Sequence, residues 1–148
     1  GDIIVKSSNL KPINASKKYY LNTTDEYPIL FIISALTKGN SSFSGIADLK
    51  NKESDRIKEM QKIIKQIGIF SKFKKNKLVI KGKKFKNNKK KLRISSLGDH
   101  RICMSAAILG LLTGLEVKIK NFETVRTSSP NFLNIIKQLG GYFEKKNI

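Results

Sequence analysis

Short strand-like segments alternate with helical segments along the whole 148-residue chain. The clearest helix is expected over residues 54–67, because its apolar residues recur at spacings of three and four and Gly68 follows. Further helices are expected over residues 28–37, over residues 100–112 and from Pro130 onward. Strands are expected over residues 2–7, 42–48, 92–95, 116–120 and 142–144, with a hairpin of 69–73 and 77–81 and a loop over 9–22. This order predicts an α/β fold with an internal repeat of two units.

The chain is strongly basic, since 30 Lys and Arg residues face 11 Asp and Glu residues and give a net charge of +19. No acidic residue occurs between Glu59 and Asp99, and such a stretch could bind the phosphates of a nucleic acid. The Lys-rich run 72–91 nevertheless carries no recognisable nucleic-acid-binding module. We therefore expect a solvated basic face that concentrates anionic substrates, and we keep a basic nucleic-acid-binding module as an alternative.

Several classes of protein are not expected. The longest apolar stretches, residues 29–36 and 102–112, are shorter than the roughly 20 residues that span a bilayer. One His and one Cys cannot form the usual ligand sets of a metal, and no Gly-rich phosphate loop or dinucleotide fingerprint occurs. We expect a cytoplasmic protein with no metal, no cofactor and no membrane segment. Residues 1–4 show neither an initiator Met nor a signal-peptide pattern, and are expected to lie inside a longer chain.

Clusters of charged and capping residues lie at the expected helix starts. The clusters lie at residues 25–26, 52–56, 98–101 and 126–131. Ser54, Asp99 and Ser129 can cap the backbone N–H groups there, and such capping explains any single cluster. Four such starts, three of them with an Arg, indicate a shared site for phosphate or carboxylate groups. Spacing alone does not show that the four starts converge.

Four segments resemble the motifs of the 5-enolpyruvylshikimate-3-phosphate (EPSP) synthases, in the same order and at matching intervals. Residues 24–30 (TDEYPIL) resemble the segment that precedes the family's C-terminal active-site motifs, and residues 52–56 (KESDR) resemble its K-E-[ST]-D-R signature. Residues 99–104 (DHRICM) resemble D-H-R-x-x-M, and residues 127–132 (TSSPNF) resemble T-S-[FY]-P-x-F. The chain therefore looks like the C-terminal portion of such an enzyme.

The resemblance implies transfer of the enolpyruvyl group of phosphoenolpyruvate to the 5-hydroxyl of shikimate 3-phosphate, with release of phosphate. Asp25 matches the group that accepts the hydroxyl proton, and Glu53 matches the acid that protonates the methylene carbon of phosphoenolpyruvate. The family's contacts to shikimate 3-phosphate correspond to Asp25, Asp48 and Lys52. Its contacts to phosphoenolpyruvate correspond to Glu53, Arg56, His100, Arg101 and Arg126. Arg126 directly precedes Thr127, where one well-known version of the motif has a Lys.

The resemblance also implies a fold of two similar domains, each built from three βαβαββ units, with the active site between them. The chain would form about two units of one domain, over residues 1–82 and 83–148, and the N-terminal domain would be absent. Without that opposite wall, we expect the chain alone to be inactive and the full-length enzyme to be a monomer. The sister enolpyruvyl transferase that acts on UDP-N-acetylglucosamine shares the fold and remains a second alternative.

Overall fold

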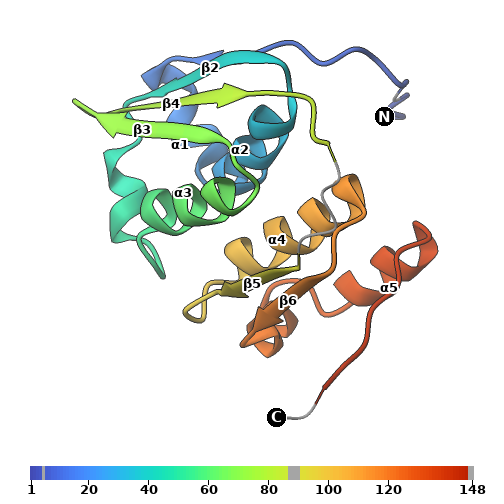
Figure 1. Cartoon of the computed structure of the whole chain (residues 1–148). Helices are drawn as coiled ribbons and strands as arrows, with labels where there is room; N and C mark the ends of the chain where they lie inside the picture. The colour runs from blue at the N-terminus through green and yellow to red at the C-terminus, as the bar shows by residue number, and fades with distance from the viewer. Residues whose placement is uncertain (5, 87–90, 147–148) are drawn as a thin grey trace.

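The computed structural model describes residues 1–4, 6–86 and 91–146 and shows a mixed α/β fold (Figure 1). Its strands are β1 (Asn14–Ala15), β2 (Gly39–Ser44), β3 (Phe70–Lys74), β4 (Lys77–Gly82), β5 (Leu92–Ser95) and β6 (Val117–Lys120). Its α-helices are α1 (Tyr20–Thr23), α2 (Tyr27–Leu36), α3 (Arg56–Gln66), α4 (His100–Thr113) and α5 (Phe132–Gln138). Short 3-10 helices are η1 (Lys17–Tyr19), η2 (Thr24–Glu26), η3 (Ala47–Asn51) and η4 (Phe122–Thr127). The predicted α/β class is confirmed.

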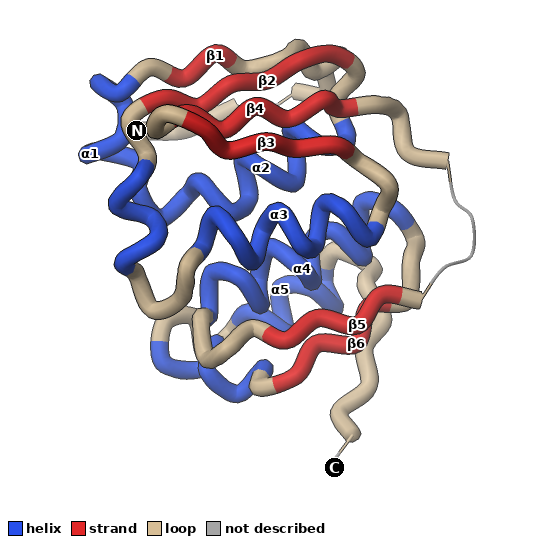
Figure 2. Tube along the Cα trace, turned by 60° about the vertical axis from the view of Figure 1, so that its left-hand side comes forward, coloured by secondary structure: helices blue, strands red, loops and turns tan. Residues whose placement is uncertain are grey.

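Helices separate two sheets, which lie at opposite sides of the molecule (Figure 2). The larger sheet has the order β1-β2-β4-β3, with β1 parallel to β2 and the other two pairs antiparallel. The β3–β4 hairpin turns at Lys75 and Asn76, whose positive φ angles of 48° and 57° are typical of a tight type I′ hairpin turn. The smaller sheet pairs β5 with β6 in parallel, and α4 connects these two strands.

The alternation of side chains decides which face of the larger sheet is buried. Phe43, Leu78 and Ile80 are fully buried and face the helices, whereas their neighbours along the strands point away. The ring of Phe31 on α2 meets that of Phe43 edge-on, with centroids 4.9 Å apart. Each fully buried apolar side chain of this size contributes about 1.5–3 kcal/mol. This packing holds α2 and α3 against the sheet, and α4 contacts both helices.

The terminal strands expected from the sequence are wrong. Residues 2–4 and 6–7 are not in a strand, Val5 lies outside the described residues, and residues 142–144 are not in a strand either. In the described part of the chain neither segment lies beside a strand that could pair with its backbone groups, and an unpaired strand is not stable. The expected loop 9–22 instead contains β1 and α1, and the last helix begins at Phe132 rather than Pro130. No helix in the described ranges has both the length and the apolar character to cross a bilayer.

Candidate active site

Arg56, the first residue of α3, lies at the centre of a cluster of carboxylates. Its side chain is only 1% exposed, and each of its three nitrogens donates to a different acidic residue. Nε donates to Asp99 at 2.9 Å, one terminal nitrogen to Asp25 at 3.0 Å, and the other to Glu53 at 2.6 Å. The guanidinium therefore joins the segments that precede α2, α3 and α4. The structure brings together three of the four helix-start clusters recognised in the sequence.

Asp99 explains why Arg56 can be buried. This carboxylate has 0% exposure and caps α4 by accepting from the backbone N–H groups of Arg101 and Ile102. It also accepts from the hydroxyl of Ser54 at 2.9 Å and from Arg56. Burial would by itself lower the pKa of Arg56, but hydrogen bonds to Asp99 and Asp25 and charge attraction to Asp99 and Glu53 raise that pKa. The arginine consequently stays charged inside the protein.

Arg101 adds a second cation beside Asp25. One terminal nitrogen of Arg101 donates to Asp25 at 3.0 Å, and the other lies 3.8 Å from Glu26. The Nε atom of Arg101 is buried and has no hydrogen-bond partner within the described ranges. A buried donor without a partner is costly, and a bound anion would relieve that cost. Both carboxylates are about half exposed, so the cluster opens to one side.

Asp25 has an altered acidity. Its pKa is lowered from 3.8, first because Arg56 donates a hydrogen bond to it, with added attraction from Arg101 and Arg56 that outweighs the effect of burial. The charge of His100 acts in the same direction. At neutral pH the Asp25 carboxylate is therefore ionised and able to accept a proton.

Asp25 is expected to titrate below pH 3.8 in the folded protein, as measured by NMR of its carboxyl carbon. Because the folded-state pKa is depressed, the contribution of Asp25 to stability is present above about pH 4 and is lost as the pH falls through that pKa. Replacing Arg101 by Gln should raise the Asp25 pKa, whereas the distant control Arg93→Gln should not. Titration of wild-type Asp25 at or above pH 3.8 would contradict this account.

Asp48 and Lys52 form a second, more exposed pair next to the cluster. The ammonium of Lys52 lies 3.1 Å from the Asp48 carboxylate, which also accepts from the phenol of Tyr20 at 3.0 Å. Burial and this hydrogen bond raise the pKa of Tyr20 to about 12, so the phenol keeps its proton and acts as a donor. Lys52 directly precedes Glu53, the candidate acid, in the chain.

His100 and Arg126 occupy different positions relative to the cluster. His100 is the first residue of α4 and is partly buried. Arg126 lies in η4, is exposed, and has no carboxylate within 4.0 Å among the described residues. The hydroxyl of Thr124 donates to the carbonyl oxygen of Gly98 at 2.7 Å, which ties η4 to the segment before α4. Arg126 is thus on a neighbouring element but outside the network of ion pairs.

Two of the three helix caps expected from the sequence are wrong. Asp99 caps α4 as expected, but α3 is capped by Asp55, and the N-cap residue of α5 is Asn131, without a side-chain hydrogen bond. The hydroxyl of Ser54 donates instead to Asp99, 45 residues away. The sequence also gave no reason to pair Asp99 with Arg56. One feature of the sequence does point to Asp99: it lies inside the D-H-R-x-x-M motif, directly before His100 and Arg101.

Two hollows of the described residues lie away from this cluster. One of about 490 Å³ is lined mainly by residues at the C-terminal end of α3 and by Lys83, Lys84, Phe85 and Lys86. The other, of about 350 Å³, lies beside the C-terminal end of α4. No group of three or more potential ligands in the described ranges could hold a metal ion. Neither hollow is lined by residues of the cluster around Arg56, whose members Asp25 and Glu53 are about half exposed.

Comparison with known proteins identifies relatives over nearly the whole chain. The description "EPSP synthase (3-phosphoshikimate 1-carboxyvinyltransferase)" belongs to the family profile that matches residues 2–136. The 3-phosphoshikimate 1-carboxyvinyltransferase of Zymomonas mobilis is 38% identical over 146 residues, or 97% of this chain and 32% of that protein. That of Campylobacter jejuni is 42% identical over 141 residues, or 95% and 31%. An EPSP synthase structure from Acinetobacter baumannii is similar with a TM-score of 0.80 at 32% identity, covering 94% of this chain and 32% of that one.

The chain spans about a third of the length of these relatives. The profile match covers the segments that contribute Asp25, Glu53, Arg56, Asp99 and Arg101. The profile match over residues 2–136 and the similar fold of a solved relative show that the chain belongs to the EPSP synthase family.

Proposed function

We propose that this chain supplies one wall of an active site that transfers the enolpyruvyl group of phosphoenolpyruvate to the 5-hydroxyl of shikimate 3-phosphate. The observation that carries the proposal is the convergence of Arg56 and Arg101 on Asp25, with Glu53 on the same guanidinium. Both substrates are anions, and a guanidinium fork binds carboxylate and phosphate oxygens in two-point contacts. The cluster thus combines anion-binding groups with two carboxylates that can move protons.

Asp25 and Glu53 have separate roles in this proposal. Asp25 accepts the proton of the attacking hydroxyl, and Glu53 protonates the methylene carbon of phosphoenolpyruvate to form a tetrahedral intermediate. Glu53 then recovers a proton from the new methyl group while the C–O bond to phosphate breaks. Asp25 gives up the hydroxyl proton, which leaves with the departing phosphate. The overall exchange yields the enolpyruvyl ether and inorganic phosphate, with no net proton left on either residue.

The ion pairs of the cluster support a change of partners on substrate binding. Arg56 and Arg101 hold Asp25 ionised and lower its pKa, which also makes it a weak base. A phosphoenolpyruvate carboxylate that takes over part of the bonding capacity of these guanidinium groups would weaken that hold. The pKa of Asp25 would then rise toward the range in which it accepts a proton more effectively. Substrate binding would in this way activate the base.

The remaining site residues are proposed as binding groups. Asp25, Asp48 and Lys52 contact shikimate 3-phosphate, and Glu53, Arg56, His100, Arg101 and Arg126 contact phosphoenolpyruvate. The separate positions of the Asp48–Lys52 pair and the Arg56–Arg101 pair support two adjacent substrate sites.

We further propose that the opposite wall belongs to an N-terminal domain and that the 148-residue chain alone is inactive. The element order β1-α2-β2-α3-β3-β4 followed by β5-α4-β6-α5 supports the division into units 1–82 and 83–148. The coverage of about a third of each relative supports a missing portion. We expect the longer enzyme to be a cytoplasmic monomer.

The proposed reaction is tested by acceptor choice. The chain is produced with its upstream coding region restored, and phosphate release from phosphoenolpyruvate is measured with shikimate 3-phosphate and with UDP-N-acetylglucosamine. Release with shikimate 3-phosphate alone is expected. Release with the UDP-sugar alone would assign the sister reaction instead, and no release with either acceptor from a folded protein would overturn the proposal. The 148-residue chain, assayed under the same conditions, is the control, and no turnover is expected from it.

Arg126→Gln in the longer enzyme is expected to raise the KM for phosphoenolpyruvate about tenfold, the effect of losing one charge-assisted hydrogen bond of about 1.5 kcal/mol. The KM for shikimate 3-phosphate should change much less. Arg93→Gln, which removes the same charge from β5, is the matched control. Equal KM values for wild type and Arg126→Gln would remove Arg126 from the site.

A further inference from the structure

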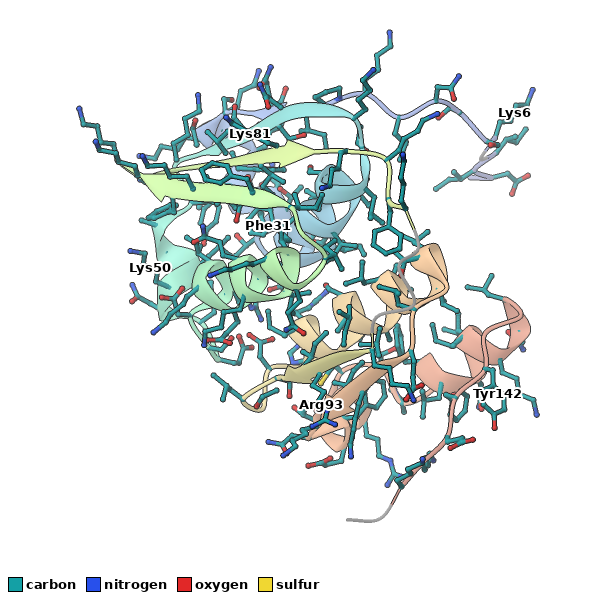
Figure 3. All side chains as sticks on the ribbon, viewed as in Figure 1. Lys6, Phe31, Lys50, Lys81, Arg93 and Tyr142 are labelled. Atoms are coloured by element: carbon teal, nitrogen blue, oxygen red, sulfur yellow. The ribbon has the colours of Figure 1, made fainter. Side chains whose placement is uncertain are left out.

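The outward face of the four-stranded sheet gathers basic side chains around one aromatic ring. The pairing of β3 with β4 places Phe70 opposite Lys81, Lys72 opposite Val79 and Lys74 opposite Lys77, all on the face away from the helices. We call Phe70, Lys72, Lys74, Lys77 and Lys81 the basic sheet face. Lys81 and the core residue Phe31 lie on opposite sides of the sheet (Figure 3).

This face carries positive charge without neutralising partners. None of the four strands of the sheet contains an acidic residue. Every ion pair found within the described ranges involves other cations, such as Lys52, Lys62 and Lys91. The four lysines of the face lie on the paired strands β3 and β4 and repel one another, because no carboxylate lies on these strands. That repulsion is relieved when phosphate groups replace the counterions.

Phe70 gives the face a second property that a simple solvated lysine patch lacks. Its ring is 55% exposed on the edge strand, although a phenylalanine on a sheet usually packs inward. The ammonium of Lys81 lies 5.3 Å from the ring centroid, so the aromatic surface and a cation are presented together. Asn40 and Ser42 of β2 supply polar side chains on the same outward face, opposite Lys81 and Val79.

A single-stranded nucleic acid fits these features better than other polyanions do. Its phosphates would pair with the lysines, which recur at every second residue along β3, about 7 Å apart. An unpaired base would stack on the exposed ring, as bases do on the aromatic side chains of open sheet surfaces. Anionic lipid would also attract the lysines, but membrane binding depends on the apolar area that is buried, and this face presents only one exposed ring.

We propose that the basic sheet face binds single-stranded nucleic acid without sequence preference. This surface lies on the outer side of the sheet, whereas the cluster around Arg56 lies at the starts of the helices, so the proposal is independent of the enolpyruvyl transfer. The sequence alone favoured a solvated basic face, because it did not show that these lysines and Phe70 share one side of a sheet. Residues 87–90 of the Lys-rich run lie outside the described residues and are not part of the proposed surface.

The test measures fluorescence anisotropy of a labelled oligouridylate of about 12 nucleotides, within the range of site sizes known for such surfaces. The 148-residue chain and its upstream-extended form are both titrated between about 50 and 200 mM salt. A variant with Lys72, Lys74, Lys77 and Lys81 all changed to Gln is expected to bind at least about tenfold more weakly and to show a flatter salt dependence. The matched control changes Lys118, Lys120, Lys137 and Lys145, which are exposed elsewhere, to Gln.

Phe70→Leu separates stacking from charge. It keeps an apolar side chain on β3 and is expected to weaken binding about fivefold or more, as loss of one base–aromatic stack does. Circular dichroism checks that every variant is folded. Equal losses of affinity in the two four-lysine variants would show that binding depends on net charge and not on this face, and would overturn the proposal. Unchanged binding by Phe70→Leu, or binding to phosphatidylserine vesicles without binding to the oligouridylate, would also overturn it.

Discussion

Changing Glu53 to Gln in the upstream-extended enzyme is expected to lower kcat by about 10²–10⁴-fold, the usual contribution of a positioned general acid. Glutamine keeps the shape of the side chain and still accepts a hydrogen bond from Arg56, but it has no proton to give to the methylene carbon. The KM values should change far less than kcat, because the anion-binding arginines remain. Phosphate release at saturating concentrations of both substrates measures the effect.

Two further measurements decide whether Glu53 acts as the proton donor. The proposed role requires that solvent deuterium enter the methyl group of the intermediate, so exchange into phosphoenolpyruvate should be lost together with turnover in Glu53→Gln. Asp25→Asn should also lower kcat, through loss of the base. Glu116→Gln removes an exposed carboxylate that pairs with Lys91 just before β5 and β6, outside the cluster around Arg56, and should leave kcat unchanged. A Glu53→Gln enzyme with near wild-type kcat would exclude the proposed acid.

Replacing Asp99 by Ala is expected to lower the free energy of unfolding by about 4 kcal/mol. Removing one partner of a buried ion pair costs about 3–5 kcal/mol, and the lower value applies here because Arg56 keeps other partners. Loss of the helix cap costs about 1 kcal/mol more. Arg56 keeps Asp25 and Glu53, but these two are about half exposed and cannot replace the buried contact at Nε. Since small domains are stable by about 5–15 kcal/mol, this change approaches the limit for folding.

Urea denaturation of the wild-type and Asp99→Ala chains measures the difference. Asp99→Asn retains a side-chain oxygen that can cap α4 and should lose less stability than Asp99→Ala, which separates the cap from the charge. The matched control is Glu116→Ala, which removes an exposed carboxylate with an ion pair to Lys91. It should leave the midpoint nearly unchanged, because exposed pairs contribute little. Equal midpoints for Asp99→Ala and wild type would contradict the structural role given to the buried pair.

The local parts of the candidate site follow from short-range spacing. Glu53 and Arg56 are three residues apart at the start of a helix, where such a pair can meet, and their ion pair at 2.6 Å follows that pattern. Asp48 and Lys52 are four residues apart and also pair. The period of apolar residues likewise predicted α3 and α4 to within a few residues. These features depend on backbone geometry within one or two turns, which the sequence specifies.

The long-range contacts were beyond such reasoning. The bonds from Arg56 to Asp99 and from Arg101 to Asp25 join residues 43 and 76 positions apart. Their formation depends on how α2, α3 and α4 pack, which is decided by burial of side chains such as Phe31 on all of these elements together. Strand partners are equally non-local, so residues 2–7 could be read as a strand although no neighbour pairs with them in the described part of the chain.

The sequence by itself determined the α/β alternation, the family and the types of side chain gathered at the helix starts, because each depends only on local spacing or on the order of motifs. Only the tertiary structure decided that Asp99 neutralises Arg56, that Ser54 supports this carboxylate rather than capping α3, and that four lysines share a sheet face with Phe70. The physical reason is that burial and ion pairing depend on which distant segments the packed core brings within a few ångströms of one another.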